Sequence, residues 1–454
     1  MIAPPRKTAS STLGASEPGA VEALPRVRAA SVLDGSGAGR PASLGVQVWN
    51  LALEWWRPVV LALLCIEAPL IVLNRFELPF GVSFGFRSFA RNIALVMIIG
   101  VAIGARGMPR FRSSLLVPMV VFFAMMAVSV AANGWLWSDA HSVGVMVGLF
   151  VGARSLAESK DGRVWLYHWL GAVAVTTVLV EIALNPAILQ FREALRDTMV
   201  TAHPNTVGAF FALVTPVLIG SIDDASARRM APFYGLSAVV GAAMTFSRLS
   251  LAGVFLGVAA IFLATWLRRH PVRLTVLGAV SVVGVVALLG YLSLGRSEAD
   301  WQRLRIIHAS LTLFSENWLS GVGFGVANLE RVFPQRYADI YGTRIWLYHS
   351  HNMYVDILTG TGILGALASG WLFVRLVSIA RRALTASREN PRLRRAAGGF
   401  AAAVVVFFLI GMGDMPWYHA RLLFPLAILW GLMEGWTRSA EADLQERAAT
   451  APRT

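Results

Sequence analysis

The sequence predicts an all-α, polytopic membrane protein with about twelve transmembrane helices, one large loop on the outer side and both termini in the cytoplasm. The first observation is composition. Of 454 residues, 56% are hydrophobic and only 15% are charged, which is more apolar surface than one water-soluble domain can bury. The second observation is a repeated series of apolar runs of bilayer length. The third is that arginines gather in alternate loops between these runs.

The apolar runs give the order of elements along the chain. Residues 1–50 are rich in Ala, Ser, Gly and Pro and predict a disordered cytoplasmic tail. Residues 51–295 are expected to hold transmembrane helices 1–9, residues 296–351 the large outer loop, residues 352–437 helices 10–12, and residues 438–454 a second cytoplasmic tail. A span takes roughly 17–25 residues, and the runs lie near residues 58–74, 87–105, 115–133, 139–157, 164–184, 205–222, 231–247, 249–267, 272–295, 352–380, 395–413 and 419–437.

Basic residues in the short loops predict the orientation, because Lys and Arg concentrate on the cytoplasmic side. The loop from Asn133 to Asp139, expected outside, has no Lys or Arg, whereas Arg75, Arg87 and Arg91 make the first outer loop an exception. This alternation places the large loop outside. The loops expected inside carry Arg106, Arg110 and Arg112; Arg154, Lys160 and Arg163; Arg228 and Arg229; Arg268, Arg269 and Arg273; and the residues from Arg381 to Arg395.

The formal net charge of +14 predicts membrane orientation rather than nucleic-acid binding, because the arginines lie in short loops between apolar spans. Cys65 is the single cysteine, so the chain has no internal disulfide and no site built from several thiolates. No Asp-x-Asp pair or His/Glu cluster has metal-ligand spacing, so neither a metal nor a cofactor is expected.

His351 is the first candidate for chemistry, since it lies in the polar segment YHSHNMY that ends the outer loop. A histidine titrates near neutrality and can take a proton from a sugar hydroxyl that attacks a phosphate-linked anomeric carbon. A single interfacial histidine with an ordinary hydrogen-bonding role is the alternative. Gly362, Ala366 and Gly370 recur every fourth residue and predict a face for close helix packing, so His351 is expected at the start of a rigid helix.

Three arginines on the outer face are candidates for binding phosphate. Arg248 lies in the short turn TFSRLS between two apolar runs, where a charge is costly unless it meets water or an anion. Arg303 and Arg305 lie in the segment WQRLR of the large loop, and guanidinium groups match phosphate oxygens bidentately. The alternatives are a charge that only sets topology for Arg248 and solvated surface residues for the other two.

Several other residues are candidate parts of a site. The run GVGFG, with Gly321 and Gly323, lacks the strand and the Lys-Ser/Thr context of a nucleotide loop, so it predicts a tight turn with a close backbone approach. His203 precedes a helix for which Asn205 is expected as the N-cap. The roles of four further polar residues stay open between a site, proton transfer and packing: Glu67, Glu181, Asp414 and His419.

An ordered set of these motifs resembles the O-antigen ligase and polymerase family of bacterial envelopes. The likeness covers roughly Thr201 to Leu432 and consists of Ser247-Arg248, Arg303, Gly321-x-Gly323-x-Gly325, His351-Asn352 and Gly362-x-x-Gly365. Members of this family are metal-independent glycosyltransferases of the GT-C class. The resemblance implies that His351 is the general base on the acceptor hydroxyl and that Arg248 and Arg303 grip the lipid-linked diphosphate. The family often has an aromatic residue four positions after the loop arginine, where this chain has Ile307, so Arg305 stays beside Arg303 as a candidate.

The resemblance further implies a place and a reaction. The protein is expected in the bacterial inner membrane, with the large loop and the active site on the periplasmic side. The reaction would be an inverting transfer of a glycan from undecaprenyl diphosphate to a hydroxyl of another glycan, of lipid A core or of a protein side chain. Membrane lipids are expected to surround the protein. Whether it is a ligase or a polymerase, and its oligomeric state, stay open.

Two functions from other classes compete with this one. A polytopic transporter of an envelope precursor would also have about twelve spans and charged residues near a cavity, but transporters often show two related halves. The chain shows no such repeat, and the large loop has no counterpart in the first half. A scaffold without catalysis would leave the histidine and arginine set without a purpose.

Overall fold

A computed structural model of the chain describes part of the sequence. The described residues are 75–77, 83–85, 93, 113–133, 138–190, 199, 203–222, 224–266, 297–345, 349–418 and 420–450. Two compact units divide the chain at residues 47 and 48, and all the described residues belong to the second. The expected tail at 1–50, the run near 58–74 and residues Glu67 and His419 lie outside the described residues.

The described chain is helical, as predicted, apart from one small hairpin. In this hairpin β1 (Arg75–Glu77) pairs antiparallel with β2 (Ser83–Gly85). The helices are α3 (Leu116–Asn133), α4 (Ser138–Ala157), α5 (Lys160–Leu184), η1 (Pro186–Gln190), α6 (Pro204–Gly220), α7 (Ala225–Met244), α8 (Arg248–Trp266), α10 (Ser297–Glu316), α11 (Val326–Tyr341), α12 (Met353–Ala386), α13 (Pro391–Gly411), η3 (Pro416–Tyr418) and α14 (Ala420–Thr450).

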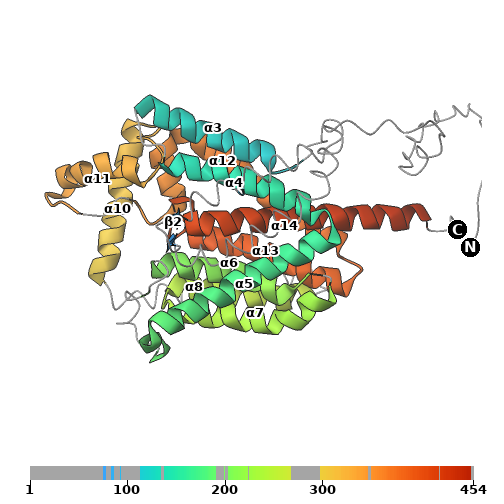
Figure 1. Cartoon of the computed structure of the whole chain (residues 1–454). Helices are drawn as coiled ribbons and strands as arrows, with labels where there is room; N and C mark the ends of the chain where they lie inside the picture. The colour runs from blue at the N-terminus through green and yellow to red at the C-terminus, as the bar shows by residue number, and fades with distance from the viewer. Residues whose placement is uncertain are drawn as a thin grey trace, which may run out of the picture. The chain divides into compact units, whose positions relative to one another are not determined.

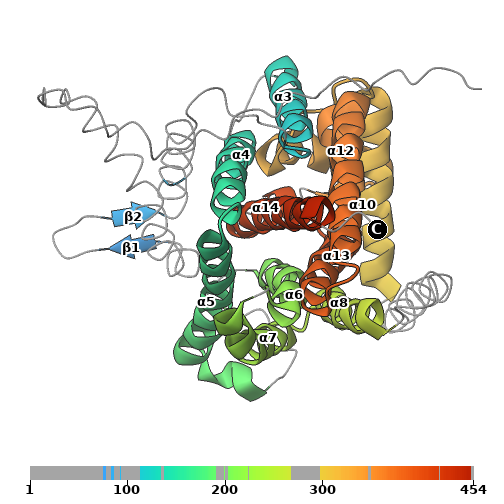
Figure 2. The same cartoon turned by 90° about the vertical axis from the view of Figure 1, so that its right-hand side faces the viewer.

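The long helices form one bundle with α14 in its middle. Figure 2 looks along the bundle and shows α14 between its neighbours, and α14 packs against α4, α5, α6, α12 and α13. Further pairs join α3 to α12, and α13 to α6 and α8. Helices joined by short connections run antiparallel (Figure 1), so α6, α8, α12 and α14 all begin at one end, called here the His351 end.

The opposite end of the bundle holds the short connections that the sequence predicts to be basic and cytoplasmic. The turns between α4 and α5, α6 and α7, and α12 and α13 lie there. Helix α14 extends beyond its neighbours at this end (Figure 1), and its residues 442–450 are exposed, so it continues through much of the expected tail at 438–454. The basic residues of these turns are Arg154, Lys160, Arg163, Arg228, Arg229, Arg381, Arg382, Arg388, Arg392, Arg394 and Arg395.

The surface of the bundle is apolar over several helices. Phe255 of α8 is 76% exposed, and Leu367 of α12 and Leu236 of α7 are 66% and 64% exposed. Water-soluble proteins seldom expose large contiguous apolar patches, whereas a lipid-facing surface consists of them. Four of the described helices, α3, α5, α12 and α13, are long and apolar enough to cross a membrane. The expected total of about twelve spans stays a prediction.

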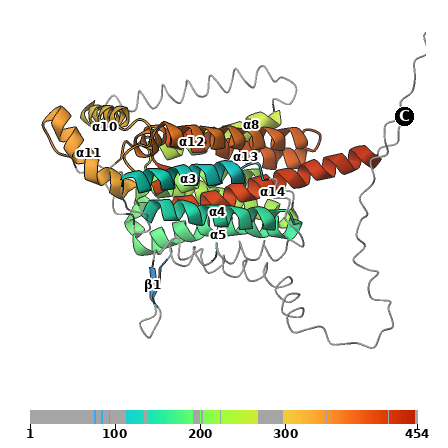
Figure 3. The same cartoon turned by 90° about the horizontal axis from the view of Figure 1, so that it is seen from above.

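The expected outer loop at 296–351 contains two helices. Figures 1 and 3 show α10 lying across the His351 end of the bundle, with α11 beside it. Apolar residues fix α10 in this place, because Ile306, Ala309 and Leu313 are buried and recur at helical spacing. The exposed residues of α10 are mixed, since Trp301, Leu304 and Leu311 lie among polar and charged side chains. The segment is therefore a folded cover of the bundle end and not an extended connection.

Aromatic rings fill the core where α3, α13, η3 and α14 meet. Trp417 of η3 lies with its ring centroid 5.4 Å from Phe122 of α3, 5.9 Å from Phe407 of α13 and 5.8 Å from Trp430 of α14. All four pairs of rings, including Phe407 with Trp430 at 5.3 Å, are in edge-to-face contact, an arrangement that adds to the burial energy of aromatic side chains. This cluster fixes the connection between α13 and α14.

A buried glutamate joins α14 to the start of α3 at the opposite end. Glu434 is 1% exposed, and its carboxylate accepts hydrogen bonds from Ser113 Oγ at 2.7 Å and from Ser114 N at 2.6 Å. Arg154 Nε of α4 lies 3.8 Å from the same carboxylate. A buried carboxylate is tolerated only when hydrogen bonds and an opposite charge compensate its desolvation. Glu434 therefore holds three helices together.

Replacing Glu434 with glutamine is expected to destabilise the protein by about 1–3 kcal/mol, because one acceptor oxygen is lost and Arg154 keeps no opposite charge at that position. Thermal unfolding of the purified protein in detergent measures this effect. Glu441→Gln is the matched control on the same helix: Glu441 pairs with Arg382, but both side chains are about one third exposed, so this loss is expected to stay below about 1 kcal/mol. Equal melting temperatures for the two variants would contradict the role of Glu434.

Candidate functional site

His351 lies in the turn that leads into α12. The helix begins at Met353, and Asn352 is its N-cap, with a side-chain oxygen that accepts hydrogen bonds from the amides of Tyr354 and Val355, both at 3.1 Å. The amide nitrogen of the same Asn352 side chain donates to the carbonyl of Met412 at 3.3 Å. The cap therefore satisfies the helix start and also ties it to the end of α13.

The backbone of His351 adopts a left-handed conformation, with φ of 53°. This conformation costs a residue with a side chain about 1–2 kcal/mol, so the surrounding turn must hold it. The amide of His351 donates a hydrogen bond to Nδ1 of His349 at 3.2 Å, and the two imidazole rings are in edge-to-face contact with their centroids 4.2 Å apart. Strained backbone of this kind is concentrated at functional sites.

Asp356 anchors this turn from within the first turns of α12. Its side chain is 1% exposed, and Oδ1 accepts a hydrogen bond from the amide of Ser350 at 2.8 Å. Oδ2 lies 4.0 Å from Nδ1 of His349. Neither Asp356 nor His349 is among the residues predicted from the sequence. A signal was present for Asp356, because a carboxylate five residues after His351 inside an apolar run is as costly as the one at Glu181.

A network of hydroxyl groups holds Arg248 at the first position of α8. Thr245 Oγ1 accepts from the amide of Ser247 at 3.2 Å, and the hydroxyl of Ser250 donates to that of Ser247 at 2.9 Å. Phe246 is left-handed with φ of 49°. Arg248 is half-buried. The turn therefore presents the guanidinium group from a fixed backbone.

The turn at residues 411–414, after α13, is contacted by the residue that follows Arg248 and by the residue that follows His351. A side chain at Gly413 would place its first carbon 2.8 Å from Cδ2 of Leu249, so Leu249 lies directly against this turn. Asn352 reaches the same turn through its hydrogen bond to Met412. The residues next to Arg248 and next to His351 thus contact one short segment at the His351 end.

The start of α6 lies against the turn that holds Arg248. A first side-chain carbon at Gly208 would lie 2.5 Å from Ser250 Oγ and 2.8 Å from Thr245 Oγ1, so only glycine fits here. His203 is the N-cap of α6, and its Nδ1 accepts a hydrogen bond from the amide of Asn205 at 3.3 Å. The prediction that Asn205 is the cap is wrong, because the proline between them occupies the first helical position and starts the helix one residue after His203.

The glycine run docks into a break in α12. Gly362 has φ of 65° and ψ of −165°, a conformation that glycine alone adopts readily, and it interrupts the helix. The amides of Val322 and Gly323 donate to the carbonyls of Thr359 and Gly360, at 2.9 and 3.1 Å. Backbone polar groups released by the break are thus satisfied by the glycine run. Two side chains of α3 join this junction, Ser129 bonding to the Gly360 carbonyl and Asn133 to the Gly321 carbonyl.

The prediction that Gly362, Ala366 and Gly370 form a face for close helix packing is therefore wrong. Gly362 is not a packing position within a continuous helix but the residue at which the helix breaks, and a side-chain carbon added at Gly370 would meet no atom within 4 Å. At Gly365 the first side-chain carbon would lie 1.9 Å from Oγ1 of Thr361, so glycine is needed there by the path of the chain after the break. Periodicity alone cannot distinguish a close helix contact from a break.

Arg303 and Arg305 lie on different faces of α10. Arg303 lies two helical turns before Ser310, on the stripe that meets α12 where Thr359 Oγ1 donates to the Ser310 carbonyl at 3.1 Å. Arg305 instead lies over the ring of Tyr341 in α11, 5.6 Å from its centroid. Both arginine side chains are exposed. Helical spacing thus places Arg303 on the same stripe of α10 as Ser310, whereas Arg305 makes a cation–π contact with Tyr341.

Two of the charged residues left open by the sequence lie at the His351 end. Asp414 is buried, and its Oδ1 accepts a hydrogen bond from the amide of Met415 at 2.8 Å. Glu181, at the end of α5, is 1% exposed and lies within electrostatic range of Arg421 at the start of α14. Among the residues that the structure describes, no group of three or more His, Cys, Asp or Glu side chains could hold a metal ion.

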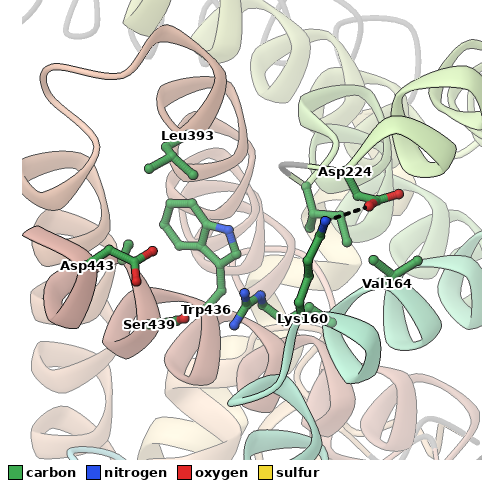
Figure 4. A pocket seen from close by; sticks show the side chains of 10 residues that line it. Lys160, Val164, Asp224, Leu393, Trp436, Ser439 and Asp443 are labelled. Atoms are coloured by element: carbon green, nitrogen blue, oxygen red, sulfur yellow. Dashed lines mark ion pairs between the residues drawn. The ribbon is translucent and has the colours of Figure 1, made fainter.

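A polar cavity of about 250 Å³ lies at the opposite end, between α5, α13 and α14 (Figure 4). Lys160 points to Asp224, with Nζ 3.6 Å from Oδ2, while Trp436 and Asp443 line the other side. Hydrogen bonds from the hydroxyl and the amide of Ser226 hold the pKa of Asp224 at about 2, below its usual value. None of the predicted site residues lines this cavity, so it is separate from the candidate site.

The segment that carries most of the predicted site residues is similar to a known protein family. Residues 233–369 match the family model described as O-antigen ligase. The chain carries an O-antigen ligase domain. Every predicted site residue except His203 lies within it, from Arg248 in α8 to Gly365 in α12. No curated protein matches the chain.

The O-antigen ligase domain spans the part of the bundle that builds the His351 end. It includes most of α7, all of α8, the helices α10 and α11 that cover the bundle end, and α12 beyond its break. The apolar helices together with this domain make the chain a membrane protein. Helix α13 and the turn at 411–414, which the neighbours of Arg248 and His351 contact, lie outside the matched residues.

Proposed function

We propose that the protein is a glycosyltransferase that moves a glycan from a lipid diphosphate to a sugar hydroxyl. The observation that carries this proposal is that the residues next to Arg248 and His351, two positions of the segment that matches O-antigen ligases, both contact the turn at residues 411–414. A base and a fixed guanidinium group at one place are what the displacement of a diphosphate by a hydroxyl requires.

The proposed reaction is a single displacement. His351 takes the proton of the acceptor hydroxyl while that oxygen forms a bond to the anomeric carbon. The bond between the anomeric carbon and the diphosphate oxygen breaks, and its electron pair leaves with the diphosphate. Arg248 stabilises the negative charge that develops on the leaving group. Because the attack and the departure occur on opposite faces of the carbon, the anomeric configuration inverts.

Arg303 is the proposed second ligand of the diphosphate. It lies on the stripe of α10 that meets α12, whereas Arg305 is occupied by its contact with Tyr341. An undecaprenyl chain would hold the donor in the membrane beside the exposed apolar surface of the bundle, so its diphosphate would lie at the level of the helix ends. The acceptor is proposed to be a hydroxyl of another glycan or of lipid A core.

The proposed orientation places the His351 end in the periplasm of the inner membrane. It rests on the basic turns of the opposite end, since short connections rich in Lys and Arg stay in the cytoplasm. Cysteines introduced singly at Asp339 on α11 and at Arg392 in the first turn of α13 test this, because both side chains are exposed. A membrane-impermeant thiol reagent applied to intact spheroplasts should label the first and leave the second unlabelled. The reverse pattern would refute the orientation.

The function itself is tested with purified protein reconstituted in vesicles. With an undecaprenyl-diphosphate-linked glycan and a glycan acceptor, the expected products are an extended acceptor and free undecaprenyl diphosphate in equal amounts. Movement of the intact donor across the bilayer without product would favour the alternative, a transporter of an envelope precursor. Binding of the donor without product or movement would favour a scaffold.

Arg248→Lys is expected to lower the transfer rate about 10- to 100-fold, because lysine keeps the charge but loses the planar pair of donors, which costs about 1.5–3 kcal/mol. The rate of product formation at saturating donor measures it. Arg392→Lys at the opposite end is the matched control, since its side chain is exposed and far from the site along α13, and its rate should equal that of the wild type. An unchanged rate in Arg248→Lys would remove the guanidinium group from the reaction.

A further inference from the structure

We propose that His349 is a positioning residue for His351, and that its neutral ring holds the His351 backbone in the conformation that the reaction needs. The inference rests on the proposed function for the meaning of that conformation. The contact itself is structural: the amide of His351 donates to Nδ1 of His349 at 3.2 Å. This hydrogen bond spans two residues and closes the turn in which His351 is left-handed.

The hydrogen bond sets the tautomer of His349. A ring nitrogen that accepts a hydrogen bond carries no proton, so in this state Nδ1 of His349 is bare and Nε2 carries the proton. The edge-to-face contact of the two rings, with centroids 4.2 Å apart, then fixes the plane of the His351 imidazole as well as its backbone. His349 thereby determines which way His351 faces without touching the reacting atoms.

Asp356 gives the turn a second arrangement. Its Oδ1 is taken by the Ser350 amide, while Oδ2 makes no hydrogen bond to the residues that the structure describes and lies 4.0 Å from Nδ1 of His349. A proton on Nδ1 would convert that nitrogen from an acceptor into a donor. It would release the His351 amide and turn the ring toward the carboxylate of Asp356. Protonation of His349 therefore removes the hydrogen bond that holds the His351 backbone.

The groups around His349 favour this exchange. Asp356 faces it from α12, and Asp414, from the turn after α13, is close enough to Asp356 for their charges to interact. Tyr418 of η3 lies with its ring centroid 6.2 Å from that of His349, and the centroid of the His351 ring lies 4.2 Å from it. A negative charge on Asp356 or Asp414 would favour a proton on His349, whereas a proton on His351 would oppose it.

The test compares two substitutions of His349. His349→Ala removes the acceptor and is expected to lower kcat at least about tenfold, with the KM values for donor and acceptor unchanged, because misplacement of a reacting group affects the chemical step. His349→Asn is the conservative variant. The side-chain oxygen of asparagine takes the place of Nδ1 and accepts a hydrogen bond from the backbone amide two residues later, as asparagine does in turns. This variant should therefore restore most of the lost kcat.

The pH profile separates positioning from a merely structural role. In the wild type, activity falls as the pH falls because His351 loses its function as a base and His349 releases it, so the acid limb of log(kcat/KM) should approach a slope of about two. Asparagine does not titrate, and the slope in His349→Asn should be about one. His168→Asn, in the part of α5 near the end of the bundle opposite His351, should keep the wild-type pH profile. A wild-type slope in His349→Asn, or an unchanged kcat in His349→Ala, would overturn the proposal.

A measurement without catalysis distinguishes failure of this proposal from failure of the proposed function. Hydrogen exchange of the full-length protein in nanodiscs, followed by mass spectrometry of overlapping peptides, reports the His351 amide. In the wild type that amide should exchange slowly at pH 8, and at pH 5 it should exchange faster than its intrinsic pH dependence predicts. It should exchange rapidly in His349→Ala and slowly at both pH values in His349→Asn. Equal exchange in all three proteins would refute the role of His349, whether or not any glycan is transferred.

Discussion

His351→Asn is expected to reduce glycan transfer by about 10²- to 10⁴-fold, the usual contribution of a general base. Asparagine is the sharper substitution at this position, because His351 has a φ of 53° and asparagine adopts the left-handed conformation more readily than other residues with side chains. The variant keeps the backbone of the turn and loses only the proton acceptor. His351→Ala should lose transfer to at least the same extent, since it adds backbone strain.

The control for His351→Asn is the same change at His168 of α5. His168 bonds to Tyr234 and Ser226 near the opposite end, so its replacement changes packing but no group of the site, and transfer should continue. Both variants are checked for membrane insertion and for melting temperature before their rates are compared. Transfer at the wild-type rate by correctly folded His351→Asn would exclude this histidine as the base.

Gly362→Ala is expected to destabilise the protein by roughly 2–6 kcal/mol. The backbone conformation at Gly362 is one that alanine populates only under strain, and the added carbon would lie 2.3 Å from the carbonyl oxygen of Leu319. The segment carrying the glycine run must then move away from α12, and its hydrogen bonds to Thr359 and Gly360 are lost. A lower melting temperature and a loss of transfer should therefore appear together.

Gly370→Ala is the matched control for this prediction. Gly370 lies in the same helix, and an added carbon there meets no atom within 4 Å. Because glycine lowers the stability of a helix interior by roughly 0.5–1 kcal/mol relative to alanine, this variant should melt at the wild-type temperature or slightly above it. If Gly362→Ala were as stable as Gly370→Ala, the break in α12 would not depend on glycine.

Hydropathy locates the helices well where their ends are apolar and less well where they are polar. The expected run at 164–184 ends at the last residue of α5, but the helix begins a turn earlier at Lys160 because Ser159 caps it. Helix α13 likewise begins at Pro391, after the cap Asn390, and not at 395. A search for apolar runs does not detect a first helical turn made of polar residues. For the same reason hydropathy predicts a loop where the structure has α10 and α11.

Proposed roles that depend on a single residue can be predicted from the sequence. His351 and Arg248 follow from their charge and their place at the ends of apolar runs. The roles of His349 and Asp356 depend on contacts within a folded turn, and that of Gly362 on a backbone angle, none of which has a periodic signature. The turn at 411–414 lies some sixty residues from His351 along the chain, so its part in the site required the three-dimensional fold.

The break at Gly362 lies where α12 is bonded to the segment between α10 and α11. Residues before it are bonded to the segment that follows α10, through Val322 and Gly323, and Ile363 just after it is bonded to the carbonyl of Trp318. The first turns of α12 and the cover made by α10 and α11 therefore form a common structural body. Because hydrogen bonds on both sides of the break reach the segment between α10 and α11, a displacement of this cover would carry the first turns of α12 with it.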